Sequence, residues 1–215
     1  MQRRRLFGSG VVAVAPMLPG VAPFGIVAGL TAIGSGLSAA QAMAMSVTIF
    51  AGAAQLATLQ LIAEQALPVV ILLTALTINL RFAMYSASLA PHLQHLGTRW
   101  HLPLAYLLVD QNYALSIHRF RHGGEDWRAW GHWYYLGAGA ALWVTWQSAT
   151  AVGVFMAARV PADWSLDFAI PLVFMVLLVP ALQTRPHVVA ALTGGGVATL
   201  AADLPLHLGI VTGAF

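Results

Sequence analysis

A run of apolar residues from position 67 to position 90 contains a single charge, Arg81. The run is long enough to cross a bilayer as a helix, which takes about 20 residues. At about 1.5 Å per residue, Arg81 would lie roughly 14 Å from the nearer end of that helix. A guanidinium at that depth costs at least about 2.5 kcal/mol unless a partner or water surrounds it. Arg81 therefore favours a polar, functional contact inside the membrane, and the alternative is a side chain that snorkels to the outer headgroups.

The rest of the chain has the same character, with 59% hydrophobic and only 8% charged residues. Soluble domains carry about 25% charged residues, so we expect an integral membrane protein. The absence of cysteine excludes disulfides and thiolate chemistry. The length predicts an all-α helical bundle of about seven transmembrane helices (six to eight), forming one transport domain over residues 1–215. The expected spans are about 10–33, 39–62, 67–90, 102–118, 132–157, 166–183 and 187–202.

The distribution of arginine predicts the orientation of these spans. We expect the N-terminal segment to be retained as the first span rather than cleaved as a signal peptide. A cytoplasmic N-terminus puts seven arginines on the inner side and only two, Arg99 and Arg159, in outer loops, as the positive-inside rule requires. The inner set is Arg3, Arg4, Arg5, Arg119, Arg121, Arg128 and Arg185. The basic net charge is thus explained by topology, and no nucleic-acid partner is expected.

The first two spans contain two unusual segments. Three prolines, ending with Pro23, lie on one helical face of the first span and predict a broken helix that presents free amides to a carboxylate. The alternative is a kinked packing helix that uses the small residues of Gly25-x-x-x-Gly29 for close contact. In the second span Gln55 lies among small residues, where it either lines a solute path or hydrogen-bonds a neighbouring helix.

The third and fourth spans carry the charged candidates. Asn79 and Arg81 lie about 200° apart on a regular helix, so they face different neighbours, whereas Tyr85 and Ser88 share the face of Arg81. Asp110 is the acidic residue in the middle of a span. It is expected to pair with Arg81, either as a carboxyl group that takes up and releases a proton during transport or as a permanent counter-ion.

Other patterns carry less information. An echo at an offset of 128 residues aligns Gly25 with Gly153 and Gln55 with Gln183, as an internal repeat would. The spacing of His118 and His122 can bind a metal on a helix, but a solvated loop explains it better. No hydrolase, phosphate-binding or zinc-protease motif is present, so we expect no cofactor, no metal and no enzymatic activity.

Taken in order, several short segments resemble the AzlC family, the large subunits of bacterial branched-chain amino acid exporters. The matching segments are Pro23-Phe24-Gly25, Phe50-Ala-Gly-Ala-Ala-Gln55, Asn79-Leu80-Arg81, Leu89-Ala90-Pro91 and Val109-Asp110. The resemblance is strong over about residues 15–115 and rests mainly on hydropathy beyond them. The family often has a second acidic residue after the aspartate, where this chain has Gln111.

The resemblance implies export of branched-chain or other small neutral amino acids across the bacterial inner membrane, together with a small membrane partner of the AzlD type. The working hypothesis is a proton-coupled secondary transporter. A higher oligomer is compatible with this hypothesis. Its substrate site would use Pro23, Phe24, Gly25, Gln55 and Asn79, and its charge switch Arg81 and Asp110. The alternatives are a passive channel or facilitator and a scaffold subunit that transports nothing.

Overall fold

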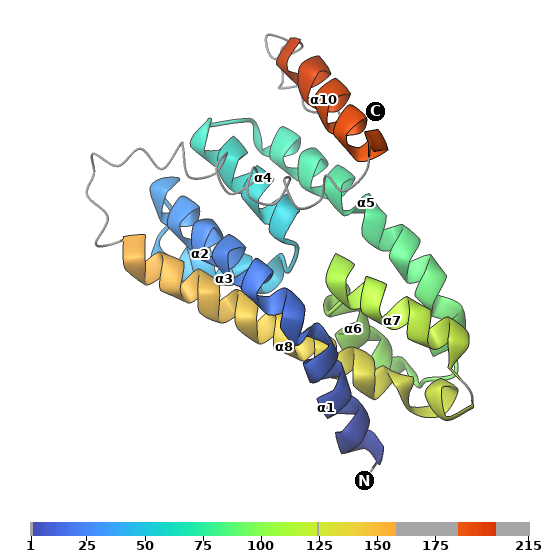
Figure 1. Ribbon diagram of the computed structural model, residues 1–215. Coiled ribbons are helices and arrows are strands. Elements are labelled where there is room, and N and C mark those ends of the chain that lie inside the picture. Colours follow the sequence, from blue (N-terminus) through green and yellow to red (C-terminus); the bar gives the residue numbers. More distant parts are fainter. Residues whose placement is uncertain (1, 124, 158–184, 201–215) are drawn as a thin grey trace. The chain divides into compact units, whose positions relative to one another are not determined.

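The computed structural model describes residues 2–123, 125–157 and 185–200, and it is helical without strands in that part of the chain. The prediction of an all-α membrane protein is confirmed. Residues 1–166 and 167–215 form two compact units, and only helix α10 of the second unit is described. The helices (Figure 1) are α1 Gln2–Val14, the 3₁₀ turn η1 Ala15–Met17, α2 Leu18–Gly34, α3 Ala39–Thr48, α4 Gly52–Ala63, α5 Pro68–Leu93, α6 Thr98–Tyr106, α7 Asp110–His122, α8 Glu125–Ala157 and α10 Arg185–Leu200.

Within the described residues, three stretches are long and apolar enough to cross a membrane: Gln2–Gly34, Pro68–Leu93 and Ala129–Ala157. They correspond to the expected spans 10–33, 67–90 and 132–157. The expected span 166–183 lies outside the described residues, and α10 overlaps the expected span 187–202.

The first and last of these stretches pack side by side as a parallel pair, α1–α2 against α8 (Figure 1). Close approach is possible because glycines face backbone on both sides. A Cβ on Gly10 would meet the backbone of Tyr134, and a Cβ on Gly29 would meet the carbonyl oxygen of Thr150. In return, Gly153 faces the backbone of Ile26. Without side chains between them, the two backbones gain dispersion contacts over several turns, which is how helices associate in lipid.

The first span is not broken where its prolines predicted a break. Pro16 lies in the 3₁₀ turn η1, and Pro19 lies in the first turn of α2, where a missing amide removes no helical hydrogen bond. Helix α2 continues through Pro23. A Cβ on Gly25 would lie 2.7 Å from the Cβ of Ala149, so Gly25 packs closely against α8. Of the two alternatives for this span, the structure therefore shows the packing helix, with Gly25 and Gly29 against α8, rather than the broken helix.

Complete interruptions occur instead in the expected spans 39–62 and 102–118. The second span is divided into α3 and α4 at residues 49–51, where Ala51 has the non-helical angles φ −151° and ψ 89°. The fourth is divided into α6 and α7 at residues 107–109, where Val109 has φ −132° and ψ 164°. Each expected span is thus a pair of short helices.

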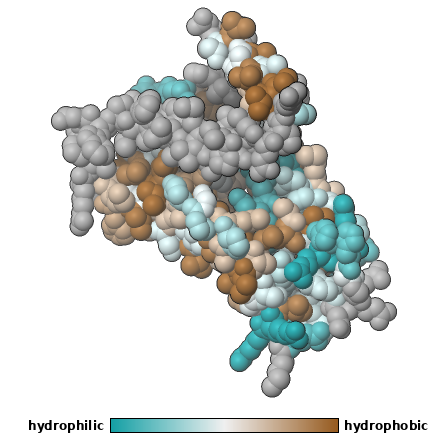
Figure 2. Space-filling model, in the orientation of Figure 1, coloured by the Kyte–Doolittle hydropathy of each residue, from teal (hydrophilic) through white to brown (hydrophobic). Residues whose placement is uncertain are grey.

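The parallel pair also determines which chain ends share a side of the membrane. Two parallel spanning helices need an odd number of crossings between them, and α5 supplies one. The guanidinium carbon of Arg3 lies 5.0 Å from the ring centroid of Trp130, so the N-terminus lies beside the beginning of α8. Figure 2 shows hydrophilic residues gathered where α1 begins. The arginines of the N-terminus and those near the end of α7 therefore lie on the same side.

We expect Gly29→Ala to destabilise the protein by about 1–3 kcal/mol, because the added methyl group forces α2 away from α8. The control is Gly20→Ala in the same helix, where a Cβ would meet nothing within 4 Å. The melting temperatures of the two variants are compared in detergent. The readout is the loss of the monodisperse peak in size-exclusion chromatography. Equal melting temperatures for both variants would contradict the packing described here.

Candidate functional site

The two helix interruptions lie beside each other. The Tyr106 hydroxyl, at the end of α6, donates a 2.6 Å hydrogen bond to the carbonyl oxygen of Val47 near the end of α3. The ring centroids of Phe50 and Tyr106 are 6.1 Å apart. The indole Nε1 of Trp143, on α8, donates to the same Tyr106 hydroxyl at 2.7 Å. Irregular backbone from two separate helix pairs, α3–α4 and α6–α7, therefore meets against α8.

Side chains satisfy carbonyl groups freed at the C-terminal ends of the interrupted helices. The Nε2 of Gln147, on α8, donates to the carbonyl oxygen of Ser46 at 3.1 Å. The Tyr135 hydroxyl, also on α8, donates to the carbonyl oxygen of Leu104 at 3.0 Å. The Nδ2 of Asn112 donates to the carbonyl oxygen of Leu107 at 2.9 Å. Such partners allow interrupted helices to exist at membrane depth.

Helix α8 also supports both interruptions by packing. A Cβ on Gly52, the first residue of α4, would lie 2.9 Å from the Cη2 of Trp146, so the indole ring packs directly on this turn. A Cβ on Gly139 would lie 2.7 Å from the Nδ2 of Asn112 and 2.9 Å from the Cβ of Leu107. Small residues at these two positions bring α8 within contact of each interruption.

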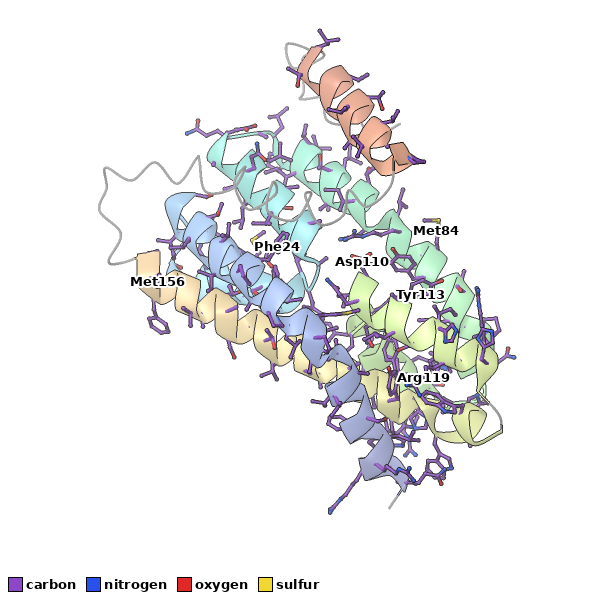
Figure 3. The ribbon with its side chains drawn as sticks, in the orientation of Figure 1. Phe24, Met84, Asp110, Tyr113, Arg119 and Met156 are labelled. Carbon is purple, nitrogen blue, oxygen red and sulfur yellow. The ribbon has the colours of Figure 1, made fainter. Side chains whose placement is uncertain are left out.

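Arg81 and Asp110 form an ion pair between α5 and α7. The Nη1 of Arg81 lies 3.2 Å from the Oδ2 of Asp110, and the side chains are 30% and 42% exposed. The other carboxylate oxygen, Oδ1, accepts a 2.9 Å hydrogen bond from the Tyr85 hydroxyl. Asp110 is the first residue of α7 (Figure 3), where the positive end of the helix dipole also favours its negative charge.

The contact continues along α5 and α7 as a polar seam. The rings of Tyr85 and Tyr113 stack with centroids 4.2 Å apart, and the Tyr113 hydroxyl donates a 3.0 Å hydrogen bond to the Oγ of Ser88. The face shared by Arg81, Tyr85 and Ser88 predicted the α5 half of this seam. Tyr113 was not among the predicted site residues, and its spacing of three from Asp110 was the available signal.

An apolar cavity of about 280 Å³ lies between α5, α6 and α8. Leu89, Leu93, Leu104 and Leu108 form much of its wall, and Ser86 and His101 contribute polar atoms. Leu89 is one helical turn beyond Tyr85, and Leu108 belongs to the interruption before Asp110. The cavity therefore adjoins both the polar seam and the α6–α7 interruption.

The remaining predicted residues occupy different positions. Gly25 faces α8, and Phe24 lies beside it on α2 (Figure 3). Gln55 is completely buried in the second turn of α4, and the Oδ1 of Asn79 is buried in α5. Among the described residues, neither the amide atoms of Gln55 nor this oxygen has a hydrogen-bond partner. Of the predicted set, the structure joins Arg81 with Asp110.

His118 and His122 do not point to a metal site. Both are exposed near the end of α7, with ring centroids 4.5 Å apart, and the Nδ1 of His122 lies 2.9 Å from the carbonyl oxygen of His118. Within the described parts of the chain, no group of three or more potential metal ligands occurs.

Comparisons with known proteins match most of the chain. A family model described as AzlC protein matches residues 16–160. An uncharacterized membrane protein of Archaeoglobus fulgidus is 31% identical over 202 residues, which cover 92% of this chain and 85% of that protein. Inner membrane protein YgaZ of Escherichia coli is 26% identical over 208 residues, covering 92% and 84%. No solved structure matches the chain.

The ion pair predicts a particular pattern of stability. Arg81→Met and Asp110→Leu should each lower the melting temperature in detergent, because each leaves one charge without its partner. The double variant should melt above both single variants, with a coupling energy of about 0.5–3 kcal/mol, since neither charge remains. Additive losses in the double variant would show that the two side chains do not depend on each other.

Proposed function

We propose that this chain, a member of the AzlC family, is an inner-membrane secondary transporter that exports branched-chain or other small neutral amino acids. The relatives it matches are described as membrane proteins. Family membership itself suggests a transport-related role. The substrate, the coupling to protons and the absence of enzymatic activity are part of the proposal.

The observation that carries this function is the pair of helix interruptions at residues 49–51 and 107–109, which meet through Tyr106. Interrupted helices are tolerated inside a membrane where they are buried in protein or line a water-filled cavity. Many secondary transporters bind substrate at such interruptions, because helix ends offer backbone groups that a continuous helix keeps for itself. A scaffold without transport activity has no need for two of them side by side.

The apolar cavity supports a small hydrophobic solute. Its volume of about 280 Å³ is near the lower end of the 300–1,000 Å³ typical of small-molecule sites. Four leucines provide an aliphatic wall, which suits an aliphatic side chain better than a sugar or an ion. Its position next to the α6–α7 interruption allows a solute to pass between the cavity and the backbone groups there.

The ion pair supports coupling to protons. Asp110 holds α7 to α5 through Arg81 and Tyr85, so adding a proton to its carboxylate removes the charge on which this contact depends. The seam would then open on protonation and close on proton release, giving two states that a proton gradient can drive. A permanent counter-ion would hold α5 and α7 together in every state.

The orientation and the partner are also proposed. The arginine-rich side shared by the N-terminus and the end of α7 is assigned to the cytoplasm by the positive-inside rule. A small membrane protein of the AzlD type is expected to assemble with the chain. Helix α5 offers an apolar face to lipid or to that partner, since Leu76, Leu80 and Met84 are exposed; Figure 3 draws Met84 away from α7.

Reconstitution into proteoliposomes tests transport and coupling together. The protein with its partner should move labelled leucine faster when a pH gradient is applied. Asp110→Asn should abolish the pH-driven component while leaving leucine counterflow largely intact, because asparagine keeps the hydrogen-bond acceptor for Tyr85 but carries no charge.

The control is Glu64→Gln, which removes a carboxylate at the far end of α4 and should leave pH-driven flux unchanged. Undiminished pH-driven flux in Asp110→Asn would exclude the coupling role. Leucine flux in the wild type that ignores pH would indicate a passive facilitator. No movement of any amino acid with both subunits present would overturn the proposed function.

A further inference from the structure

The interrupted helices differ in how their two kinds of ends are satisfied. Side chains donate to the carbonyl oxygens of Ser46 and Val47 at the end of α3, and to that of Leu107 after α6. At the opposite ends, by contrast, no described side chain caps the first amides of α4 or of α7. The first amide groups of any helix have no partner within the helix. Both interruptions therefore present uncapped, positively polarised helix N-termini.

The two N-termini differ in charge. Helix α7 begins with Asp110, whose carboxylate lies in its first turn. Helix α4 begins with Gly52-Ala53-Ala54 and has no acidic residue in its first turn. The positive end of α7 thus has an anionic group of its own, whereas the positive end of α4 has none. A carboxylate supplied by a ligand would complete α4 in the way that Asp110 completes α7.

Gln55 provides an independent sign of a ligand at this end of α4. Its side chain is 0% exposed, yet neither Nε2 nor Oε1 has a hydrogen-bond partner among the described residues. Leaving such a group unpaired typically costs about 1–3 kcal/mol. Helical side chains lean toward the N-terminus of their helix, so the amide of Gln55 is directed back over the uncapped turn.

The ring of Trp146 packs on the same turn of α4. Its ring packs against Gly52, and its buried Nε1 has no hydrogen-bond partner in the described part of the chain. The Cη2 and Cζ3 edge of the ring meets Gly52, so Trp146 forms an aromatic wall of this turn and Gln55 supplies its unpaired polar atoms. Side chains that are both buried and unpaired are uncommon in proteins and call for a partner.

We propose that the N-terminus of α4, with Gln55 and Trp146, binds the carboxylate group of the transported amino acid. This inference rests on the proposed function and assigns one end of its substrate. The amides of Gly52 and Ala53 and the Nε2 of Gln55 donate to the carboxylate. The Oε1 of Gln55 accepts a hydrogen bond from the ammonium group. Asp110 is then left out of substrate binding and remains free to exchange a proton.

Competition for labelled leucine binding in nanodiscs tests the assignment on the full chain with its partner subunit. In the wild type, 4-methylpentanoate, which keeps the carboxylate of leucine and lacks its amine, should compete better than leucinamide, which lacks the carboxylate. Gln55→Met keeps the volume of the side chain and removes both polar atoms. It should weaken leucine binding at least tenfold and weaken the competition by 4-methylpentanoate to a similar extent. Leucinamide, which keeps the amine, should lose only its contact with Oε1, so its competition should weaken less.

A second variant removes a backbone donor without touching Gln55. Ala53→Pro deletes one amide of α4 within its first turn, where proline is tolerated. It should weaken leucine binding several-fold while the melting temperature stays near that of the wild type. The control, Gln60→Met, changes an exposed glutamine later in the same helix and should bind leucine like the wild type.

The outcomes separate this inference from the function on which it rests. If the wild type binds and exports leucine while Gln55→Met and Ala53→Pro bind it with unchanged affinity, the carboxylate site is wrong and the transport function stands. Equal competition by leucinamide and 4-methylpentanoate in the wild type would also overturn the site. Absence of leucine binding and flux in the wild type would remove the proposed function itself.

Discussion

The structure depends on one constraint, which is that backbone amide and carbonyl groups inside a bilayer need partners from the protein. Continuous helices such as α5 satisfy it within themselves. The interruptions at residues 49–51 and 107–109 cannot, and much of the polar chemistry of the chain is placed around them. Tyr106, Asn112, Tyr135 and Gln147 each donate to a carbonyl oxygen near these interruptions.

Helix α8 is the element that makes these interruptions stable. Glycine contacts lock it to α1 and α2 along several turns, which gives a rigid parallel pair. From that pair, Tyr135, Trp143 and Gln147 reach the interrupted helices with hydrogen bonds. Helix α5, in contrast, meets α7 through a seam of ion pair, hydrogen bonds and stacked rings. The fold therefore combines a fixed pair with a contact whose strength depends on charge.

Hydropathy, arginine placement and helix geometry predicted the all-α membrane fold and the shared face of Arg81 and Tyr85. They left open whether the first span is broken or packed as a kinked helix, because proline in a sequence does not reveal whether a neighbouring helix holds it in place. Pro23 stays helical against α8, whereas Ile49-Phe50-Ala51 leaves the helical conformation without any proline or glycine. The partners that stabilise this second break, such as Gln147, are about 100 residues away along the chain. Local sequence contains no trace of a pairing at that distance.

The two uncapped helix ends suggest how charge and substrate can be handled separately. At α7 the positive end is matched by Asp110, which belongs to the protein and is the proposed proton-exchange group. At α4 the matching negative group is absent, and the buried amide of Gln55 has no partner among the described residues. Because the interruptions touch through Phe50 and Tyr106, a movement at one end reaches the other by direct contact. A substrate carboxylate at α4 and a proton at Asp110 would then act on the same pair of interrupted helices, which is the physical link that coupled transport requires.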